Sequence, residues 1–284
     1  VDNALRDFQL SGIALEDHQQ RRFGDIKKRL AELSTQFSNN VLDATHGWHK
    51  QLDHVEDLAG IPDSAVASYR QAAKAKSQRG YVISLDIPAY LPLMQYCDNA
   101  SLRREMYTAY TTRASDQGPN AGQWDNSVLM DEILSLRHEL SLLLGFENYA
   151  QRSLATKMSE TPEQVELFLL DLAEKSLPVA RQDFAELQTF ASEQGLAQLE
   201  AWDVPYYSEK LRLKKYALSQ EELRPYFPAD KVIDGMFTIV GKLFDLEFSQ
   251  LNSIDSWHPD VKFFQVLRVG NVIAKFYLDI FARE

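Results

Sequence analysis

Apolar side chains spaced three and four residues apart are the feature that most restricts how this sequence can fold. Ile26, Leu30, Leu33, Phe37 and Val41 follow this spacing, and charged residues lie on the other face. Such a stripe is typical of an amphipathic helix that buries one side. The same reasoning predicts helices over the first 45 residues and over residues 65–77, 89–97, 101–113, 127–144, 161–193, 205–217 and 229–243.

Strand-like runs are short and gather near the carboxyl end. Residues 263–267 and 272–281 flank the pair Gly270-Asn271, a pattern that favours a β-hairpin. A further short run covers residues 80–85, and a strand is expected to begin after Trp48. The predicted fold class is therefore mainly α, a multi-helix structure with a small C-terminal β-hairpin or sheet. We predict one helical region over residues 1–125 and a second over 126–284 that leads into the sheet, with no clear linker.

Charge and cysteine content narrow the classes of partner and compartment. The 284 residues carry a formal net charge of −11, and such a surface repels nucleic acid and acidic membrane surfaces. No apolar run approaches the roughly 20 residues of a membrane-spanning helix. The lone Cys97 cannot form an internal disulfide, which fits a reducing, cytoplasmic compartment. We interpret Cys97 as a small buried apolar residue at a helix end.

Two groups of residues resemble metal sites, and neither is complete. His138-Glu139 opens like the zinc-protease signature, but Leu142 stands where the second histidine would be required. His46, His49 and His54 lie close together in sequence, and solvated side chains are the simpler interpretation than adventitious metal binding. Composition, periodicity and spacing therefore identify no catalytic group in the chain.

Several longer strings carry a resemblance to a known family. These strings are LGFENYA at 144–150, WD at 202–203, YYSEK at 206–210, ELRPYFP at 222–228, WHPDV at 257–261 and FYLD at 276–279. In this order and spacing they resemble the thimet-oligopeptidase-like zinc metallopeptidases, family M3. The strings NNVLDAT at 39–45, LDIPAYLP at 85–92 and TRASDQGPN at 112–120 look like its bacterial oligopeptidase A branch.

The resemblance implies a fold and an activity. Members of this family form a helical ellipsoid with a deep channel, in which a zinc-bound water attacks short peptides. The zinc ligands lie on a His-Glu-x-x-His helix and the helix after it, downstream of the FYLD string. This chain starts at Val1 and ends five residues after Asp279, so both ends look cut. We therefore expect zinc in the full-length protein, none in this chain, and no catalytic residue or activity in this chain alone.

The alternatives and the candidate site residues follow from the same resemblance. A dipeptidyl carboxypeptidase of the same family is one alternative, and a non-enzymatic helical scaffold or binding module is another. Surfaces that meet missing segments should be exposed and apolar, so self-association through the C-terminal hairpin is expected. The candidates for lining the substrate cleft, each weighed against a packing role, are Tyr206, Tyr207, His258, Tyr277, Asp279 and Arg283.

Overall fold

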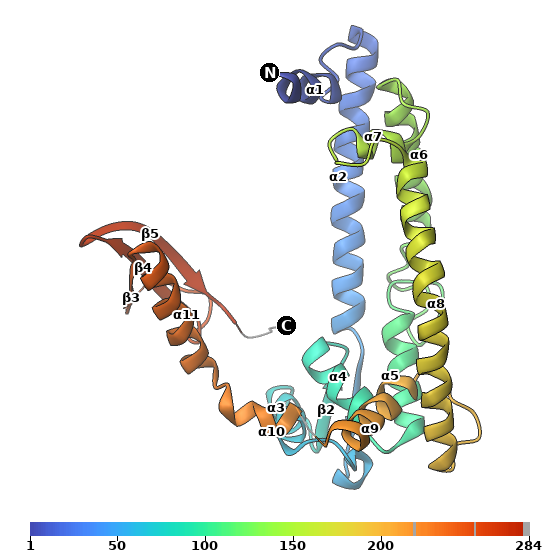
Figure 1. Ribbon diagram of the computed structural model, residues 1–284, viewed down its shortest axis with the longest axis vertical. Helices are drawn as coiled ribbons and strands as arrows, with labels where there is room; N and C mark the ends of the chain where they lie inside the picture. Colours follow the sequence, from blue (N-terminus) through green and yellow to red (C-terminus); the bar gives the residue numbers. More distant parts are fainter. Residues whose placement is uncertain (218–219, 253, 281–284) are drawn as a thin grey trace. The chain divides into compact units, whose positions relative to one another are not determined.

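The computed structural model describes residues 1–217, 220–252 and 254–280, and these residues form two compact units. Unit 1 is Val1–Leu211 and unit 2 is Arg212–Glu284. The boundary that the sequence suggested, between residues 125 and 126, falls inside unit 1. Figure 1 shows the order of the elements along the chain in colour.

Unit 1 is built from helices and one small sheet. Its helices are α1 (Asp2–Leu10), α2 (Asp17–His46), α3 (Asp63–Ala75), α4 (Ile87–Tyr96), α5 (Ala100–Thr111), α6 (Ser127–Leu143), α7 (Tyr149–Leu154), α8 (Pro162–Glu193) and α9 (Val204–Tyr216), which continues into unit 2. The short 3-10 helix η1 is Val55–Leu58, and β1 (His49–Leu52) pairs antiparallel with β2 (Tyr81–Ser84). The predicted helices are present, but the first one is divided at residues 11–16, where Gly12 has a φ of +81°.

The main core of unit 1 lies where β2 meets α3, α4 and α5. Ile83, Leu93, Met94 and Met106 are almost completely buried there. Cys97 belongs to the same cluster, as its interpretation as a buried apolar residue required, and burial raises the pKa of its thiol.

α2 and α6 pack side by side along a second contact (Figure 1). Leu33 of α2 is buried against Leu129 and Ile133 of α6. Two guanidinium–carboxylate pairs lie beside this contact: Arg22 Nη2 is 2.6 Å from Glu139 Oε2, and Arg29 Nε is 2.6 Å from Glu132 Oε1. Charge pairs between exposed helices add little stability, so the apolar contact is the main attachment of α6.

Unit 2 places one helix on a three-stranded sheet. It contains α10 (Gln220–Leu223), the 3-10 helix η2 (Arg224–Tyr226), α11 (Ala229–Phe244) and the strands β3 (Glu247–Leu251), β4 (Lys262–Arg268) and β5 (Asn271–Leu278). The strands are antiparallel in the order β3-β4-β5. Phe237 of α11 stacks on Phe248 at 4.4 Å between ring centroids and meets Phe264 edge-on at 5.0 Å. The predicted C-terminal hairpin is therefore confirmed: it consists of β4 and β5, and β3 is the third strand of the sheet.

The helices differ from membrane spans in length or in composition. Within the described part of the chain, no helix combines the length and apolar character that crossing a bilayer requires.

Candidate functional site

Tyr277 and Asp279, at the end of β5, contact the segment between β3 and β4 in which His258 lies. The Trp257 Nε1–H donates a hydrogen bond of 2.9 Å to Asp279 Oδ2, just beyond the end of β5. The Tyr277 hydroxyl donates to the backbone oxygen of Asp255 at 3.2 Å, and its ring lies 5.2 Å from the Trp257 ring. The segment between β3 and β4 thus holds both Tyr277 and Asp279 in place.

His258 lies in the tight turn of that segment. Its backbone oxygen accepts from the Ser256 hydroxyl and from the Val261 N–H, at 3.0 and 3.1 Å. Its Nδ1 accepts the Asp260 N–H at 3.2 Å, so in the neutral ring the proton lies on Nε2. The imidazole is half-exposed, and its hydrogen bonds fix the turn.

A cavity of about 400 Å³ lies at the same end of unit 2, between α11 and the sheet. Lys262 Nζ and Asp230 Oδ1 form an ion pair of 2.6 Å at this cavity. Its lining residues are Ala229, Asp230, Gln250, Pro259, Asp260, Val261, Lys262, Leu278 and Ile280.

Tyr206 and Tyr207 belong to unit 1, where both rings are buried. The Tyr206 hydroxyl donates 2.6 Å to Asp98 Oδ1, and Lys210 Nζ lies 3.6 Å from the same oxygen. Burial, followed by this hydrogen bond, raises the pKa of Tyr206. The contacts attach α9 to the loop between α4 and α5.

Arg103 connects the same region to the string at 202–203. Its Nη2 donates 2.5 Å to Asp203 Oδ1, its Nη1 donates 2.6 Å to the backbone oxygen of Cys97, and its guanidinium carbon lies 4.1 Å from the Tyr206 ring centroid. Arg103 and Asp203 are 2% and 3% exposed, so this is a buried ion pair. No local sequence pattern points to Arg103, because its partner lies 100 positions away.

The candidate residues therefore separate into two groups. Tyr277 and Asp279 contact the segment of unit 2 that carries His258, whereas Tyr206 and Tyr207 take part in the packing of unit 1. Arg283, with Phe281, lies outside the described residues. Cleft lining stays a prediction for all six candidates. Trp257, which organises the group in unit 2, could have been found from its place in the string at 257–261.

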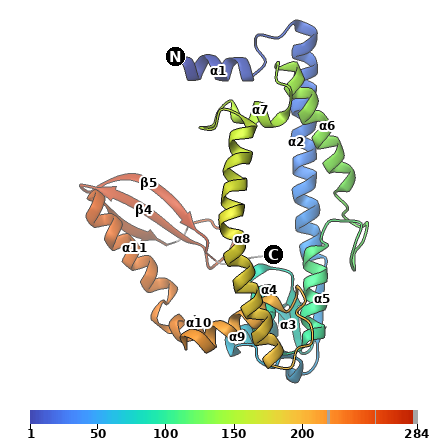
Figure 2. The ribbon, with the colours of Figure 1, turned by 45° about the vertical axis from the view of Figure 1, so that its right-hand side comes forward.

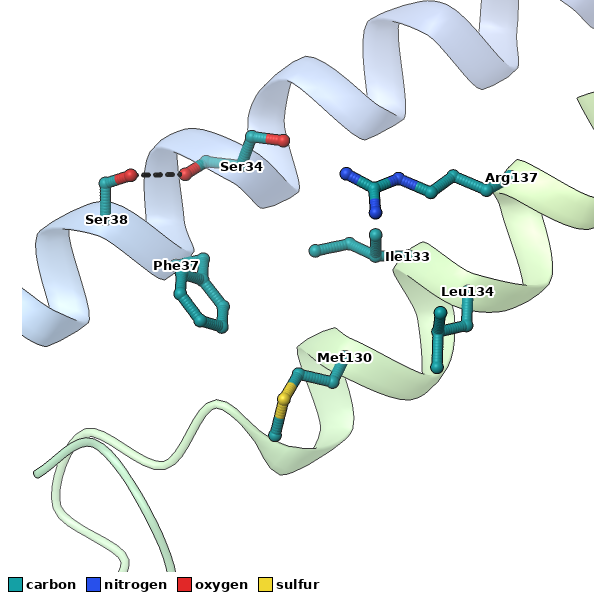
Figure 3. Close-up of a pocket in the computed structure, with 7 residues that line it drawn as sticks. All are labelled: Ser34, Phe37, Ser38, Met130, Ile133, Leu134 and Arg137. Carbon is teal, nitrogen blue, oxygen red and sulfur yellow. Dashed lines mark hydrogen bonds between the residues drawn. The ribbon is translucent and has the colours of Figure 1, made fainter. Parts of the chain in front are cut away.

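An apolar hollow of about 380 Å³ lies between α2 and α6 (Figure 3). Of its described lining residues, Arg137 alone is charged, and Ser34 and Ser38 line it beside aliphatic and aromatic groups. Such a hollow can hold an apolar side chain, and its residues provide no acid–base pair. The full lining is Ser34, Phe37, Ser38, Met130, Ile133, Leu134 and Arg137.

The described residues do not provide a donor set for zinc. Among them, no three histidine, cysteine or carboxylate side chains converge as a metal site would require. Glu139 of the incomplete signature is paired with Arg22, and His46 Nε2 lies 3.9 Å from Asp86 Oδ1. No catalytic step through a metal can therefore be assigned to these residues.

Comparison with known proteins identifies the family. The sequence model of peptidase family M3 matches residues 93–284, about two thirds of the chain. The chain belongs to peptidase family M3. Its motifs had indicated this membership, which is now confirmed.

Individual relatives align with this chain along its whole length. Oligopeptidase A of Salmonella typhimurium is 54% identical over 286 residues, which cover 100% of this chain and 42% of that protein. Probable cytosolic oligopeptidase A of Arabidopsis thaliana is 40% identical over 295 residues, covering 100% of this chain and 41% of that protein. Dipeptidyl carboxypeptidase of Salmonella typhimurium is 29% identical over 292 residues, covering 100% of this chain and 42% of that protein. The chain thus spans less than half the length of these relatives.

Proposed function

We propose that this chain is part of a cytoplasmic, zinc-dependent oligopeptidase that hydrolyses short peptides. The observation that carries the proposal is the 54% identity with oligopeptidase A along all of this chain. The plant relative whose name says cytosolic supports the compartment. Because the described residues lack a donor set for zinc, the metal would be held by polypeptide outside them. The chain alone would then be inactive.

Within that enzyme, we assign β5 a role in holding the peptide. One edge of β5 pairs with β4, and among the described residues no strand pairs with its other edge. A free strand edge can bind an extended peptide through main-chain hydrogen bonds, and side chains beside it add preference. Tyr277 is 43% exposed, and Asp279 is oriented by Trp257, so both could contact such a peptide.

The second candidate function is that of a dipeptidyl carboxypeptidase. The 29% identity with such an enzyme favours it less than the 54% identity favours oligopeptidase A. The two activities differ in what they require at the peptide's carboxyl end. An enzyme that releases C-terminal dipeptides needs a free carboxylate, whereas an endopeptidase cleaves a peptide whose carboxyl end is blocked as an amide.

The test uses the full-length gene product and the 284-residue chain side by side. We expect the full-length protein to cleave a blocked peptide of about ten residues, to lose activity with a chelator and to regain it with zinc. The chain alone should cleave nothing. Cleavage restricted to peptides with a free carboxylate would instead establish the carboxypeptidase. If the full-length protein cleaves neither peptide in the presence of zinc, the peptidase proposal is wrong and a scaffold or binding module is the remaining alternative.

A further inference from the structure

α8 carries large apolar side chains over a wide arc of its circumference. Two rows run along residues 168–184, and within each row the spacing is four or seven residues, so each row keeps to one side of the helix. Residues two positions apart, such as Phe168 and Leu170, point in nearly opposite directions. All six side chains are at least 45% exposed: Phe168, Leu172 and Val179 in one row, and Leu170, Leu177 and Phe184 in the other.

The polar side of α8 lies between the two rows and includes Glu174 and Arg181. Lys175 Nζ lies 2.7 Å from Asp171 Oδ2, and Gln182 follows seven residues later on the same side. A helix at the surface of a protein needs an apolar stripe of about 100° toward the core, with polar residues elsewhere. The two rows lie on nearly opposite sides of α8, so its apolar arc is wider than that stripe and only part of it can face the core of unit 1.

The exposed rows continue an interface that already exists. In the last turns of α8, Leu187, Phe190 and Ala191 are buried against Tyr206 and Tyr207 of α9. Phe190 extends the row of Val179 by three turns, and Leu187 and Ala191 lie on the apolar arc between the two rows. Packing of another helix on this face is therefore how unit 1 buries it at one end. Figure 2 shows α8 running from α7 to that contact with α9.

The other end of α8 is hollowed beside α7. A cavity of about 550 Å³ opens there, large enough to hold bulky side chains of a packed segment. Leu169 and Leu170 of α8 face Ala150 and Leu154 of α7 across it. The hollow and the two rows form one apolar surface, which we name the α8 face. It consists of Ala150, Leu154, Val165, Phe168, Leu169, Leu170, Leu172, Leu177, Val179 and Phe184.

We propose that the α8 face is the docking surface for polypeptide of the same protein that lies outside residues 1–284. The relatives supply the reason for choosing this occupant. This chain aligns with 42% of oligopeptidase A, so more than half of such a protein has no counterpart here. The occupant is apolar and helical in character, because the face is straight and is already covered by a helix where it is buried. The inference does not depend on the peptidase activity.

Cysteine labelling tests the proposal in the full-length gene product. Leu177→Cys places a thiol in one exposed row, and Val179→Cys places one in the other. Gln182→Cys, on the polar side, is the matched control. In the 284-residue chain all three thiols should react rapidly with a maleimide, since Cys97 is buried. In the full-length protein we expect labelling at positions 177 and 179 to slow by at least about tenfold, and labelling at position 182 to stay within about twofold.

The possible outcomes separate the occupants. Equal labelling of positions 177 and 179 in the two proteins overturns the proposal, and so does a gene that encodes nothing beyond these residues. Protection that appears only when the full-length protein is concentrated, together with a doubling of its mass in light scattering, would identify a second copy as the occupant and would also overturn it. Two positions are labelled so that one poorly tolerated substitution does not decide the result.

Discussion

At the residue scale, the buried pair of Arg103 and Asp203 determines how α9 joins unit 1. Removing one member of a buried ion pair leaves an uncompensated charge, which costs about 3–5 kcal/mol. We expect Asp203→Asn to lower the free energy of unfolding of unit 1 by about 3 kcal/mol in urea. Glu105→Gln, which breaks the exposed pair with Lys50, is the control and should cost less than about 1 kcal/mol. Equal effects would show that the buried pair contributes no more than the exposed one.

Tyr90 makes the free energy of unfolding of unit 1 fall as the pH rises in the alkaline range. Burial, with smaller contributions from Tyr110 and Tyr107, raises the pKa of Tyr90 from its ordinary 10.0 to about 12. The unfolded chain therefore ionises first. The stabilisation is complete below pH 10 and is lost as the pH rises toward 12. We expect Tyr90→Phe, which keeps the ring stacked 4.1 Å from Tyr110, to lose less stability in that interval.

Unfolding midpoints in urea at pH 8, 10 and 11.5 would measure this effect. Tyr226→Phe is the control, because that side chain is 79% exposed, and it should follow the unaltered protein. A Tyr90→Phe protein with the same pH dependence as the unaltered chain would contradict the assignment.

The candidate residues show what could be foreseen at this scale. Aromatic residues in the strings at 206–210 and 276–279 could be selected from the sequence, because their types suit both packing and peptide contact. Their partners could not. Asp98 is 108 positions from Tyr206, and Trp257 is 22 positions from Asp279, so the fold alone brings them together.

At the element scale, Gly80 allows β1 and β2 to be joined closely. Its φ is +72°, and a Cβ there would lie 2.1 Å from the backbone oxygen of Leu52. Gly122 has a similar φ of +76° with no atom within 4 Å of the same position. Gly122→Ala should therefore cost about 1–2 kcal/mol, the left-handed strain alone. Gly80→Ala should cost clearly more, because the strand backbone must move. Thermal unfolding of the two variants measures both losses of stability. Equal losses would show that the backbone accommodates the Cβ of residue 80 without a clash.

The elements themselves were largely predictable, and their pairing was less so. Helices such as α6 and α8 follow from apolar spacing and from end signals such as Thr161, whose hydroxyl accepts from the Gln164 N–H. The break between α1 and α2 escaped prediction because the periodicity continues on both sides of it. Pairing of β1 with β2 joins residues that are about 30 positions apart, and nothing in either four-residue strand specifies its partner.

At the scale of the whole molecule, the sequence favours two regions that meet at residue 125 with no clear linker, and the structure forms two compact units that meet after Leu211. α2 and α6 lie on opposite sides of the suggested boundary, yet they share a core. Amphipathic patterns show that each helix buries a face but do not show which helix covers it. The exposed side chains of α11 illustrate the same limit: Val232, Met236, Ile239 and Leu243 form an outer row opposite Phe237, whose ring contacts the sheet.

The 284-residue chain is expected to associate with itself through the outer edge of β5. The outer edge of β5 has no strand partner among the described residues. Val272 and Ile273, two residues of this strand, are about half-exposed. An unpaired edge with apolar side chains favours pairing with a second copy. We expect the average mass in light scattering to rise with concentration. A lysine on an edge strand opposes such pairing, so Ile273→Lys should keep the chain monomeric.

The choice of variant follows from the fold. Phe276 stacks at 5.6 Å on Phe264 and meets Phe237 of α11, so a lysine there would damage the core of unit 2 and would not test the edge. Leu42→Lys, at an exposed apolar position on α2 in unit 1, is the matched control and should leave the association unchanged. If the chain is monodisperse at every concentration, the β5 edge does not associate. Pairing through β5 should be disrupted by a charge at position 273 and not by one at position 42. If Leu42→Lys dissociates the complex as well as Ile273→Lys does, the association is therefore non-specific.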